Sequence, residues 1–146
     1  NGSITAIYTV LVEGDDLDDP IADASRAILD GHIVLSRQLA DEGVFPAVDI
    51  SASISRAMVS LVDKQHYAGL QALKEHMATY HANRDLITIG AYQRGSDPRI
   101  DAAIQLHPQI MEFLRQPIES SISMTESVTA LQTLTGVTGE QGVSDE

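Results

Sequence analysis

The sequence predicts an α/β front over about residues 1–62, an all-helical back over 63–135 and a disordered tail over 136–146. The front opens with SITAIYTVLV (3–12), an almost continuously apolar run rich in β-branched residues. Such a run is typical of a strand buried on both faces of a parallel sheet. In the back, apolar residues recur at intervals of three and four, which is the pattern of amphipathic helices. The tail is polar, as chain ends without fixed structure usually are.

The rest of the front reads as a loop, a helix and a further short element. EGDDLDDP (13–20) is an acidic loop in which Asp19 is placed to cap a helix that begins with proline. That helix is expected to end at Gly31. HIVLSR (32–37) is either a strand or the start of a helix, and the following residues continue helically as far as Gly43.

The back is expected to contain three main helices. The first is long and amphipathic and covers about 64–86. GAYQRGSDP is a turn-rich break, and its Asp97–Pro98 pair signals the start of the next helix. Pro108 is expected to begin a further turn, and a last helix is expected over about 124–134.

Composition and charge narrow the classes of function. With 146 residues, 43% of them hydrophobic, the chain can bury one sizeable core or two small ones. It has no cysteine, and no apolar run reaches the ~18–20 residues of a membrane span, so we expect neither secretion nor membrane spanning. The net charge of −12 is concentrated in the first third of the chain. Such a surface repels nucleic acid and suits a basic protein partner, although a solvated acidic face is the alternative.

No metal site is expected. On the long helix His76 and His81 are five residues apart, so they do not share a face as two metal ligands would. The histidines are better explained as solvent-facing or capping residues. The four aspartates of the acidic loop lack the spacing of a calcium loop, and proline follows them at once. No GxSxG, HExxH or GxGxxG motif is present.

One cation interrupts a stretch of small and apolar residues. FPAVDISASISRAM (45–58) carries Arg56 near its end. From spacing alone, Arg56 either forms an ion pair with Asp49 or Asp63 or has a functional role. Phe45, which precedes a proline, would on the same basis be a residue of the hydrophobic core.

The stretch GSITAIYTVLVEGDDLDDPIADASRAILDGHIVLSRQLADEGVFPAVDISASISRAM is followed, in order, by NRDLITIGAYQRGSDPRIDAAI and FLRQ. Together these stretches resemble the flagellar type III secretion ATPases, which are relatives of the rotary ATP synthase catalytic subunits. The resemblance runs from Gly2 to about Leu134. Virulence-secretion ATPases share the first block, but GAYQRGSDP and NRDL are closer to the flagellar branch.

The resemblance implies the back part of a RecA-like parallel-sheet ATPase domain, followed by a C-terminal helical domain. The whole protein would be a hexameric ring that holds ATP and Mg²⁺ at subunit boundaries. Arg56 occupies the position of the arginine finger, which stabilises charge on the γ-phosphate bound by the neighbouring subunit. Phe45 aligns with an aromatic residue that stacks on adenine. Ile118 and Met124 lie near the segments that close the other side of the base pocket.

The resemblance also implies partners and a location. The acidic loop matches the region that faces the central stalk, which implies that a basic stalk protein binds Asp15, Asp16, Asp18 and Asp19. Export chaperone–substrate complexes are the other expected partners. The location implied is cytoplasmic, peripheral at the inner-membrane export apparatus and associated with its export gate.

Parts of an ATPase are missing from this sequence. It contains no GxxxxGK[ST] phosphate loop, no strand with a magnesium-binding Asp and no glutamate to orient water. A strand that begins two residues into the chain would also lack neighbours. We therefore expect the back part of a longer protein-secreting ATPase, and we expect the 146-residue chain alone to be inactive and to hold no cofactor. The alternative is a non-catalytic helical interaction module that docks chaperone–substrate complexes or a stalk protein.

Overall fold

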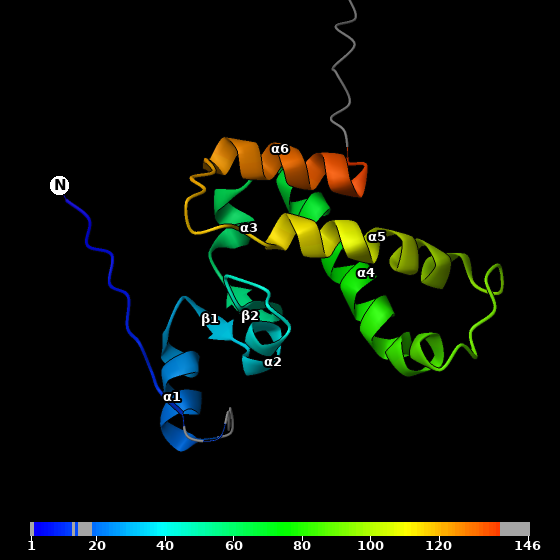
Figure 1. Ribbon diagram of the computed structural model, residues 1–146. Coiled ribbons are helices and arrows are strands. Elements are labelled where there is room, and N and C mark those ends of the chain that lie inside the picture. The colour runs from blue at the N-terminus through cyan, green and yellow to red at the C-terminus, as the bar shows by residue number, and fades with distance from the viewer. Residues whose placement is uncertain (1, 13, 15–18, 138–146) are drawn as a thin grey trace, which may run out of the picture.

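An α/β front precedes an all-helical back in the computed structural model, which describes residues 2–12, 14 and 19–137 (Figure 1). An α/β part followed by a helical part agrees with the predicted fold class. The elements are α1 (Pro20–Ile28), β1 (Gly31–Leu35), α2 (Arg37–Asp41), β2 (Val48–Ser55), α3 (Met58–Leu61), α4 (Lys64–Thr88), α5 (Pro98–Leu114) and α6 (Met124–Thr135). Of the tail expected over 136–146, only Gly136 and Val137 belong to the described residues.

Residues 3–12 do not form the strand that their composition predicts. The segment is an extended trace with exposed apolar side chains, among them Ile4, Ile7 and Leu11 (Figure 1). A strand exists only when its backbone groups bond to a neighbouring strand. The described part of the chain offers this segment no such neighbour, so the prediction of a strand is wrong for this structure.

The front contains a two-stranded antiparallel sheet. Gly31 of β1 lies opposite Ser55 of β2, and Leu35 lies opposite Val48. The described residues therefore form no parallel sheet. Gly31 was expected to end α1, but α1 ends at Ile28 and Gly31 starts β1 instead. A Cβ atom at Gly31 would come within 2.6 Å of the Ile54 carbonyl oxygen, so the close approach of the strands requires glycine there.

Helices α1 and α2 begin at polar caps, of which the cap at Asp19 was predicted. The Asp19 carboxylate accepts hydrogen bonds from the N–H groups of Ile21 at 2.9 Å and Ala22 at 3.1 Å, and so caps α1. The Ser36 hydroxyl caps α2 in the same way. Gly43, with a positive φ of 71°, lies just beyond the end of α2.

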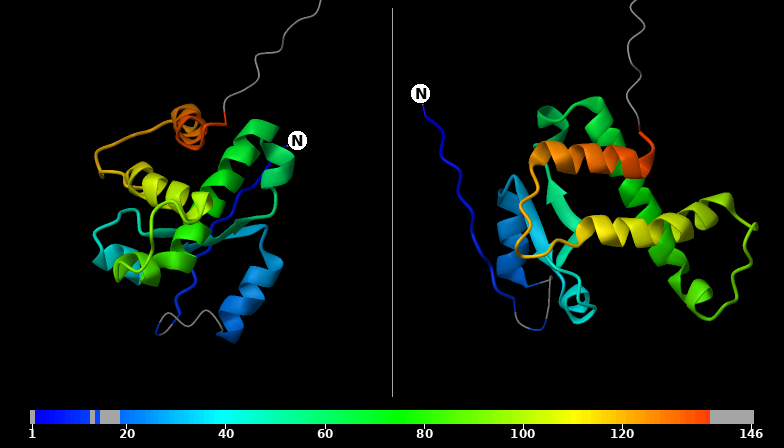
Figure 2. Two further views of the ribbon diagram at one scale, coloured as in Figure 1. Left: turned by 90° about the vertical axis from the view of Figure 1, so that its right-hand side faces the viewer. Right: turned by 45° about the horizontal axis from the view of Figure 1, so that its top comes forward.

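The hydrophobic core lies in the helical back, where α5 and α6 both pack against α4 (Figure 2). Its buried members are Leu73 and Met77 of α4, Ile110 of α5 and Leu131 of α6. Gly69 of α4 faces Leu131, which lies 3.3 Å from the position a Cβ would take, so the glycine allows α6 to approach closely. Ile50 of β2 packs against the same core and joins the front to it.

Helix α5 continues through Pro108, where a new turn was expected. Proline removes one helical hydrogen bond and disfavours a continuous helix, so contacts on both sides must compensate. Ile110 is buried in the core, and the His107 ring stacks on Tyr80 of α4 with ring centroids 3.6 Å apart. These contacts hold both halves of α5 against α4.

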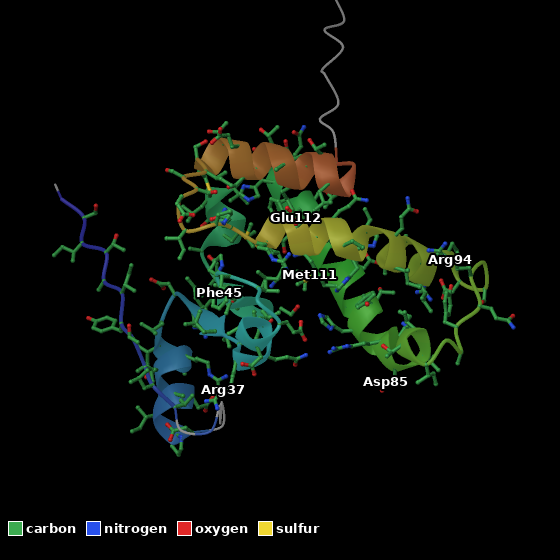
Figure 3. All side chains as sticks on the ribbon, in the orientation of Figure 1. Arg37, Phe45, Asp85, Arg94, Met111 and Glu112 are labelled. Atoms are coloured by element: carbon green, nitrogen blue, oxygen red, sulfur yellow. The ribbon has the colours of Figure 1, made fainter. Side chains whose placement is uncertain are left out.

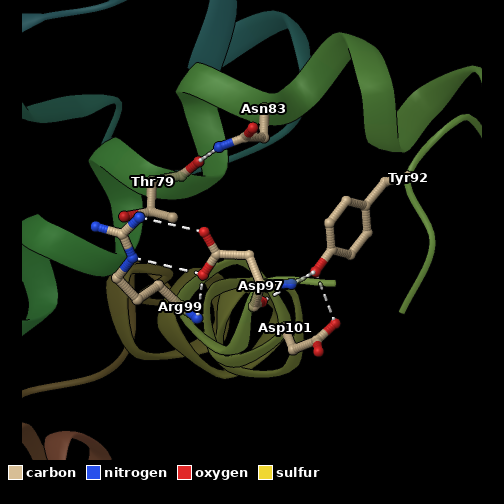
Figure 4. A network of polar contacts seen from close by, with 6 residues as sticks. All are labelled: Thr79, Asn83, Tyr92, Asp97, Arg99 and Asp101. Carbon is tan, nitrogen blue, oxygen red and sulfur yellow. Dashed lines mark hydrogen bonds and ion pairs between the residues drawn. The ribbon is translucent and has the colours of Figure 1, made fainter. Parts of the chain in front are cut away.

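The turn between α4 and α5 is built around Tyr92 (Figure 4). Its hydroxyl oxygen lies 3.0 Å from the Asp97 carbonyl oxygen and 3.0 Å from Asp101 Oδ1. Asp97 caps α5 through the N–H of Arg99 at 2.8 Å, and the hydrogen bond and charge of Arg99 lower the pKa of Asp97. Burial raises the pKa of Tyr92, so the hydroxyl stays protonated and keeps its donor.

A cleft of about 190 Å³ separates α2 and β2 from α4 and α5. The Arg84 guanidinium lies 3.7 Å from the Glu42 carboxylate across it. The stacked rings of Tyr80 and His107 form another part of its wall. Burial lowers the pKa of His107, and the positive charge near it lowers the pKa further. The imidazole is therefore neutral around pH 7, which suits its packing on an aromatic ring.

Leu73→Ala is expected to reduce the free energy of unfolding by about 2–5 kcal/mol, because it leaves a cavity between α4, α5 and α6. Leu73 is 2% exposed. The matched control is Leu86→Ala on the same helix, where the side chain is half exposed and the loss should be about 1 kcal/mol or less. Urea unfolding followed by circular dichroism measures both. Equal losses would contradict a core shared by the three helices.

Candidate functional site

Arg56 follows the last residue of β2 directly and lies on the surface. Its backbone N–H donates to the Asp30 carbonyl oxygen at 2.8 Å. Its guanidinium reaches the end of α1, where Nη1 lies 3.2 Å from the Ala27 carbonyl oxygen and Nη2 lies 3.1 Å from that of Arg26. These two carbonyls belong to the last turn of α1, where the helix dipole gives the carbonyl groups partial negative charge.

The structure excludes the ion pairs considered for Arg56. Asp49 Oδ1 accepts the N–H groups of Ser51 at 2.8 Å and Ala52 at 2.9 Å, and so closes a turn within β2. Asp63 Oδ1 accepts the N–H of His66 at 2.7 Å and caps α4. Neither carboxylate pairs with Arg56. Within the described part of the chain the guanidinium contacts only neutral carbonyl groups, so no described carboxylate neutralises its charge.

Phe45 is half exposed, with 54% of its surface accessible, so it is not the core residue that its sequence context alone would suggest. It follows the buried Val44, and its backbone carbonyl accepts a hydrogen bond, while the ring stays open to solvent. Figure 3 shows Phe45 on the same side of the molecule as the C-terminal end of α5. An aromatic ring held in this way can stack on a planar ligand.

The segment after α5 reaches Phe45 through the backbone. The Gln116 N–H donates to the Phe45 carbonyl oxygen at 2.8 Å. Gln116 was not among the predicted site residues, and no sequence signal could have found it, because it acts through its main chain. Ile118 and Met124, predicted on the other side of the base pocket, are 96% and 71% exposed. Their roles remain predictions.

The predicted partner-binding residues divide into two groups. Asp15, Asp16 and Asp18 lie outside the described residues. Asp19 is described, and its carboxylate is engaged in capping α1. Its role in partner binding therefore stays a prediction, beside a structural role that the hydrogen bonds establish.

Across residues 2–12, 14 and 19–137, no three His, Asp or Glu side chains gather closely enough to ligate a metal ion. Among the helices described, none combines the length and apolar character needed to cross a bilayer.

Comparison with known families divides the chain at about the same place as the fold. Residues 1–55 match the nucleotide-binding domain of the ATP synthase alpha/beta family. Residues 62–133 match the C-terminal domain of the type III secretion ATPase EscN. The two matches together leave out only the short segment around α3 and the end of the chain.

Individual relatives agree with these matches. The flagellum-specific ATP synthase of Salmonella typhimurium (strain LT2) is 57% identical over 130 residues, which are 89% of this chain and 28% of the relative. The flagellum-specific ATP synthase of Bacillus subtilis (strain 168) is 52% identical over 136 residues, 93% of this chain and 31% of the relative. The chain thus spans less than a third of the length of these relatives.

A solved structure shares the fold. The assembled ATPase EscN from the type III secretion system of enteropathogenic E. coli superposes with a TM-score of 0.88 at 45% identity, over 92% of this chain and 32% of that one. This likeness confirms the predicted class, an α/β part followed by a C-terminal helical domain. The family matches and the relatives agree: over most of its length the chain is similar to one part of the flagellar type III secretion ATPases.

Proposed function

We propose that this chain is the C-terminal part of a ring-forming ATPase that hydrolyses ATP to drive the export of flagellar proteins through a type III secretion apparatus. The observation that carries the proposal is the state of Arg56. Its guanidinium is exposed, extends from the end of a strand and has no carboxylate partner among the described residues. Structural arginines are usually neutralised, so a free cation at this position suits a role in binding phosphate.

Arg56 serves as the arginine finger. In the ring, its guanidinium leaves the carbonyls of Arg26 and Ala27 and binds the γ-phosphate held by the neighbouring subunit. The exchange is favourable because hydrogen bonds to a charged phosphate are stronger than bonds to neutral carbonyls at a solvent-exposed site. Charge that develops during phosphoryl transfer is then stabilised from across the subunit boundary. Mg²⁺ accompanies ATP and is held by residues outside this chain.

Phe45 stacks on the adenine ring, and the segment 115–118 approaches the base from the other side. The hydrogen bond from Gln116 to Phe45 supports this placement, because it brings the segment to the aromatic residue. Ile118 and Met124 offer exposed apolar surface that fits the second wall of a base pocket.

The proposal divides the chain into an ATPase part (1–62) and a C-terminal helical domain (63–135). The ring is a homohexamer, and the acidic loop binds a basic stalk protein. A solved relative, EscN, has been described in complex with its central stalk EscO, which supports a stalk partner for this chain. Export chaperone–substrate complexes also bind, and the protein works in the cytoplasm, peripherally at the inner-membrane export gate.

A second function is favoured by the position of the core. Leu73, Met77, Ile110 and Leu131 all belong to the helical back. A domain with its own core can present a binding surface without ATP. On this proposal the back docks chaperone–substrate complexes or a stalk protein, and the front is not needed for that binding.

Arg56→Ala in the full-length protein is expected to lower ATP turnover by roughly 10³–10⁵-fold, with ATP binding nearly unchanged, because the finger acts mainly in the transition state. Steady-state hydrolysis and equilibrium binding of a fluorescent ATP analogue measure the two effects. Arg94→Ala removes the same charge from the exposed α4–α5 turn and should retain full turnover. Normal turnover in Arg56→Ala would contradict the proposed function.

Phe45→Ala is expected to raise KM for ATP by about 10-fold, because base stacking on an aromatic ring contributes of that order. Phe45→Tyr keeps the ring face and should stay close to the wild-type KM. Initial rates at varied ATP concentration measure the difference. If both variants shift KM equally, or neither does, the ring does not stack on the base.

Replacing Asp15, Asp16 and Asp18 together by Asn is expected to weaken binding of a basic stalk protein roughly 10-fold at low salt, because the partners attract electrostatically. Asp19 is retained because it caps α1. The control removes the same charge elsewhere, at the exposed Asp85, Glu112 and Glu119.

The measurement is a pull-down repeated from about 0.05 M to about 0.5 M salt, across which the screening length falls severalfold. Binding that does not change with salt concentration, or that weakens equally in the control variant, would exclude the acidic loop as the contact surface.

A further inference from the structure

The strand that carries Arg56 is strongly bulged. His32 lies opposite Ile54 and Val34 lies opposite Asp49, so residues 50–53 of β2 share a single partner residue, Ile33. Regular pairing cannot satisfy the backbone groups of such a segment. The bulge ends only a few residues before Arg56, and its shape therefore decides where the guanidinium emerges.

Side chains replace the missing ladder bonds. Within β2, the Asp49 carboxylate accepts two backbone N–H groups, and the Ser53 hydroxyl accepts the N–H of Val34 at 3.0 Å. His32 Nε2 lies 3.1 Å from the Ala52 carbonyl oxygen. Lys74 Nζ donates to the Ser53 carbonyl oxygen at 3.2 Å.

Lys74 differs from the other side chains that bind the bulge, because it comes from α4. It is partly buried, and it forms no ion pair with any residue that the structure describes. A partly buried ammonium more often lies near a carboxylate, so its hydrogen bond to a neutral carbonyl stands out. Its neighbour Leu73 is buried in the helical core, which fixes α4 at this point.

We propose that Lys74 is a positioning residue for Arg56: its ammonium holds the Ser53 carbonyl and thereby fixes the bulged end of β2 from which the finger extends. This inference rests on the proposed role of Arg56. Arg56 lies three positions beyond Ser53, about 10 Å along the chain at the usual rise of a strand. A second anchor, the bond from the Arg56 N–H to Asp30, lies at the other end of this short span.

The hydrogen bond between Lys74 and Ser53 links the position of Arg56 to the helical back. Ile50 packs against the helical core and Lys74 binds Ser53, so both ends of the bulge contact elements of the back. A shift of α4 relative to β2 would move the Ser53 carbonyl and, with it, Arg56. A partner that binds the helical back could use this route to alter turnover.

The test compares lysine variants of the full-length protein. Lys74→Met keeps the apolar stem and loses the donor, and it should lower kcat by roughly 10- to 100-fold, since small displacements of catalytic groups cost that much. KM for ATP should change less than about 3-fold, because Arg56 contributes little to ground-state binding. Lys74→Arg restores a cationic donor and should recover most of the rate.

Lys64→Met is the matched control, because it removes the same charge from the first turn of the same helix, about 15 Å away along its axis. It should leave kcat unchanged. Should Lys74→Met fail to fold, Lys74→Gln keeps a polar end that is too short to reach and is compared with Lys74→Arg in the same way. Full kcat in the folded Met or Gln variant would overturn the inference.

A double variant separates this inference from the proposed function. If Lys74 acts through Arg56, adding Lys74→Met to Arg56→Ala should lower single-turnover rates by less than about 2-fold. Independent, multiplicative losses would overturn the inference and leave the finger intact. If Arg56→Ala alone has no effect on turnover, the proposed function fails, and the inference fails with it.

Amide hydrogen exchange tests the contact without any activity. Peptides covering residues 53–57 should exchange about 10-fold faster in Lys74→Met than in the wild type or in Lys64→Met. Unchanged exchange in that segment would overturn the inference even if kcat fell.

Discussion

The close pairing of Gly31 with Ser55 is the contact on which the arrangement of the front depends. It brings β2 so near to β1 that no side chain fits at position 31, where a Cβ would meet the Ile54 carbonyl. Because β1 follows α1 after a short link, the same pairing carries Arg56 to the end of α1. A basic side chain thus reaches backbone carbonyls in the last turn of a helix from 30 residues further along the chain. Without that pairing, the end of β2 would have no fixed relation to the rest of the front.

Elements whose signals are local could be predicted from the sequence, and elements that depend on distant contacts could not. The caps at Asp19 and Asp97 and the apolar spacing of α4 were read correctly, because each is a property of consecutive residues. The strand expected at 3–12 failed because a strand depends on neighbours that composition cannot supply. The continuity of α5 through Pro108 relies on packing against α4. β2 is a miss of another kind, because VDISASIS alternates apolar residues with aspartate and serines, the local pattern of a half-buried strand, and no strand was predicted there.

The candidate site, like the fold, could be predicted only in part from the sequence. Spacing could not decide whether Arg56 pairs with Asp49 or Asp63, and the fold decides against both because each carboxylate bonds to its own local backbone. The resemblance to a known family singled out Arg56 and Phe45 before any geometry was available. Lys74 had no motif to mark it, because its partner is a carbonyl brought near only by the packing of α4. Every residue has a backbone carbonyl, so the residue type of the acceptor does not reveal such a hydrogen bond.

The backbone hydrogen bond between Gln116 and Phe45 places almost no restriction on the amino acid at position 116. Since donor and acceptor are both main-chain atoms, the identity of the side chain at position 116 is immaterial to the bond. Any amino acid except proline retains the donor. Pro117 follows, and it already biases its predecessor toward an extended backbone, so the geometry is favoured whatever residue stands there. Position 116 can therefore accept any residue but proline while the backbone contact to the aromatic residue is kept.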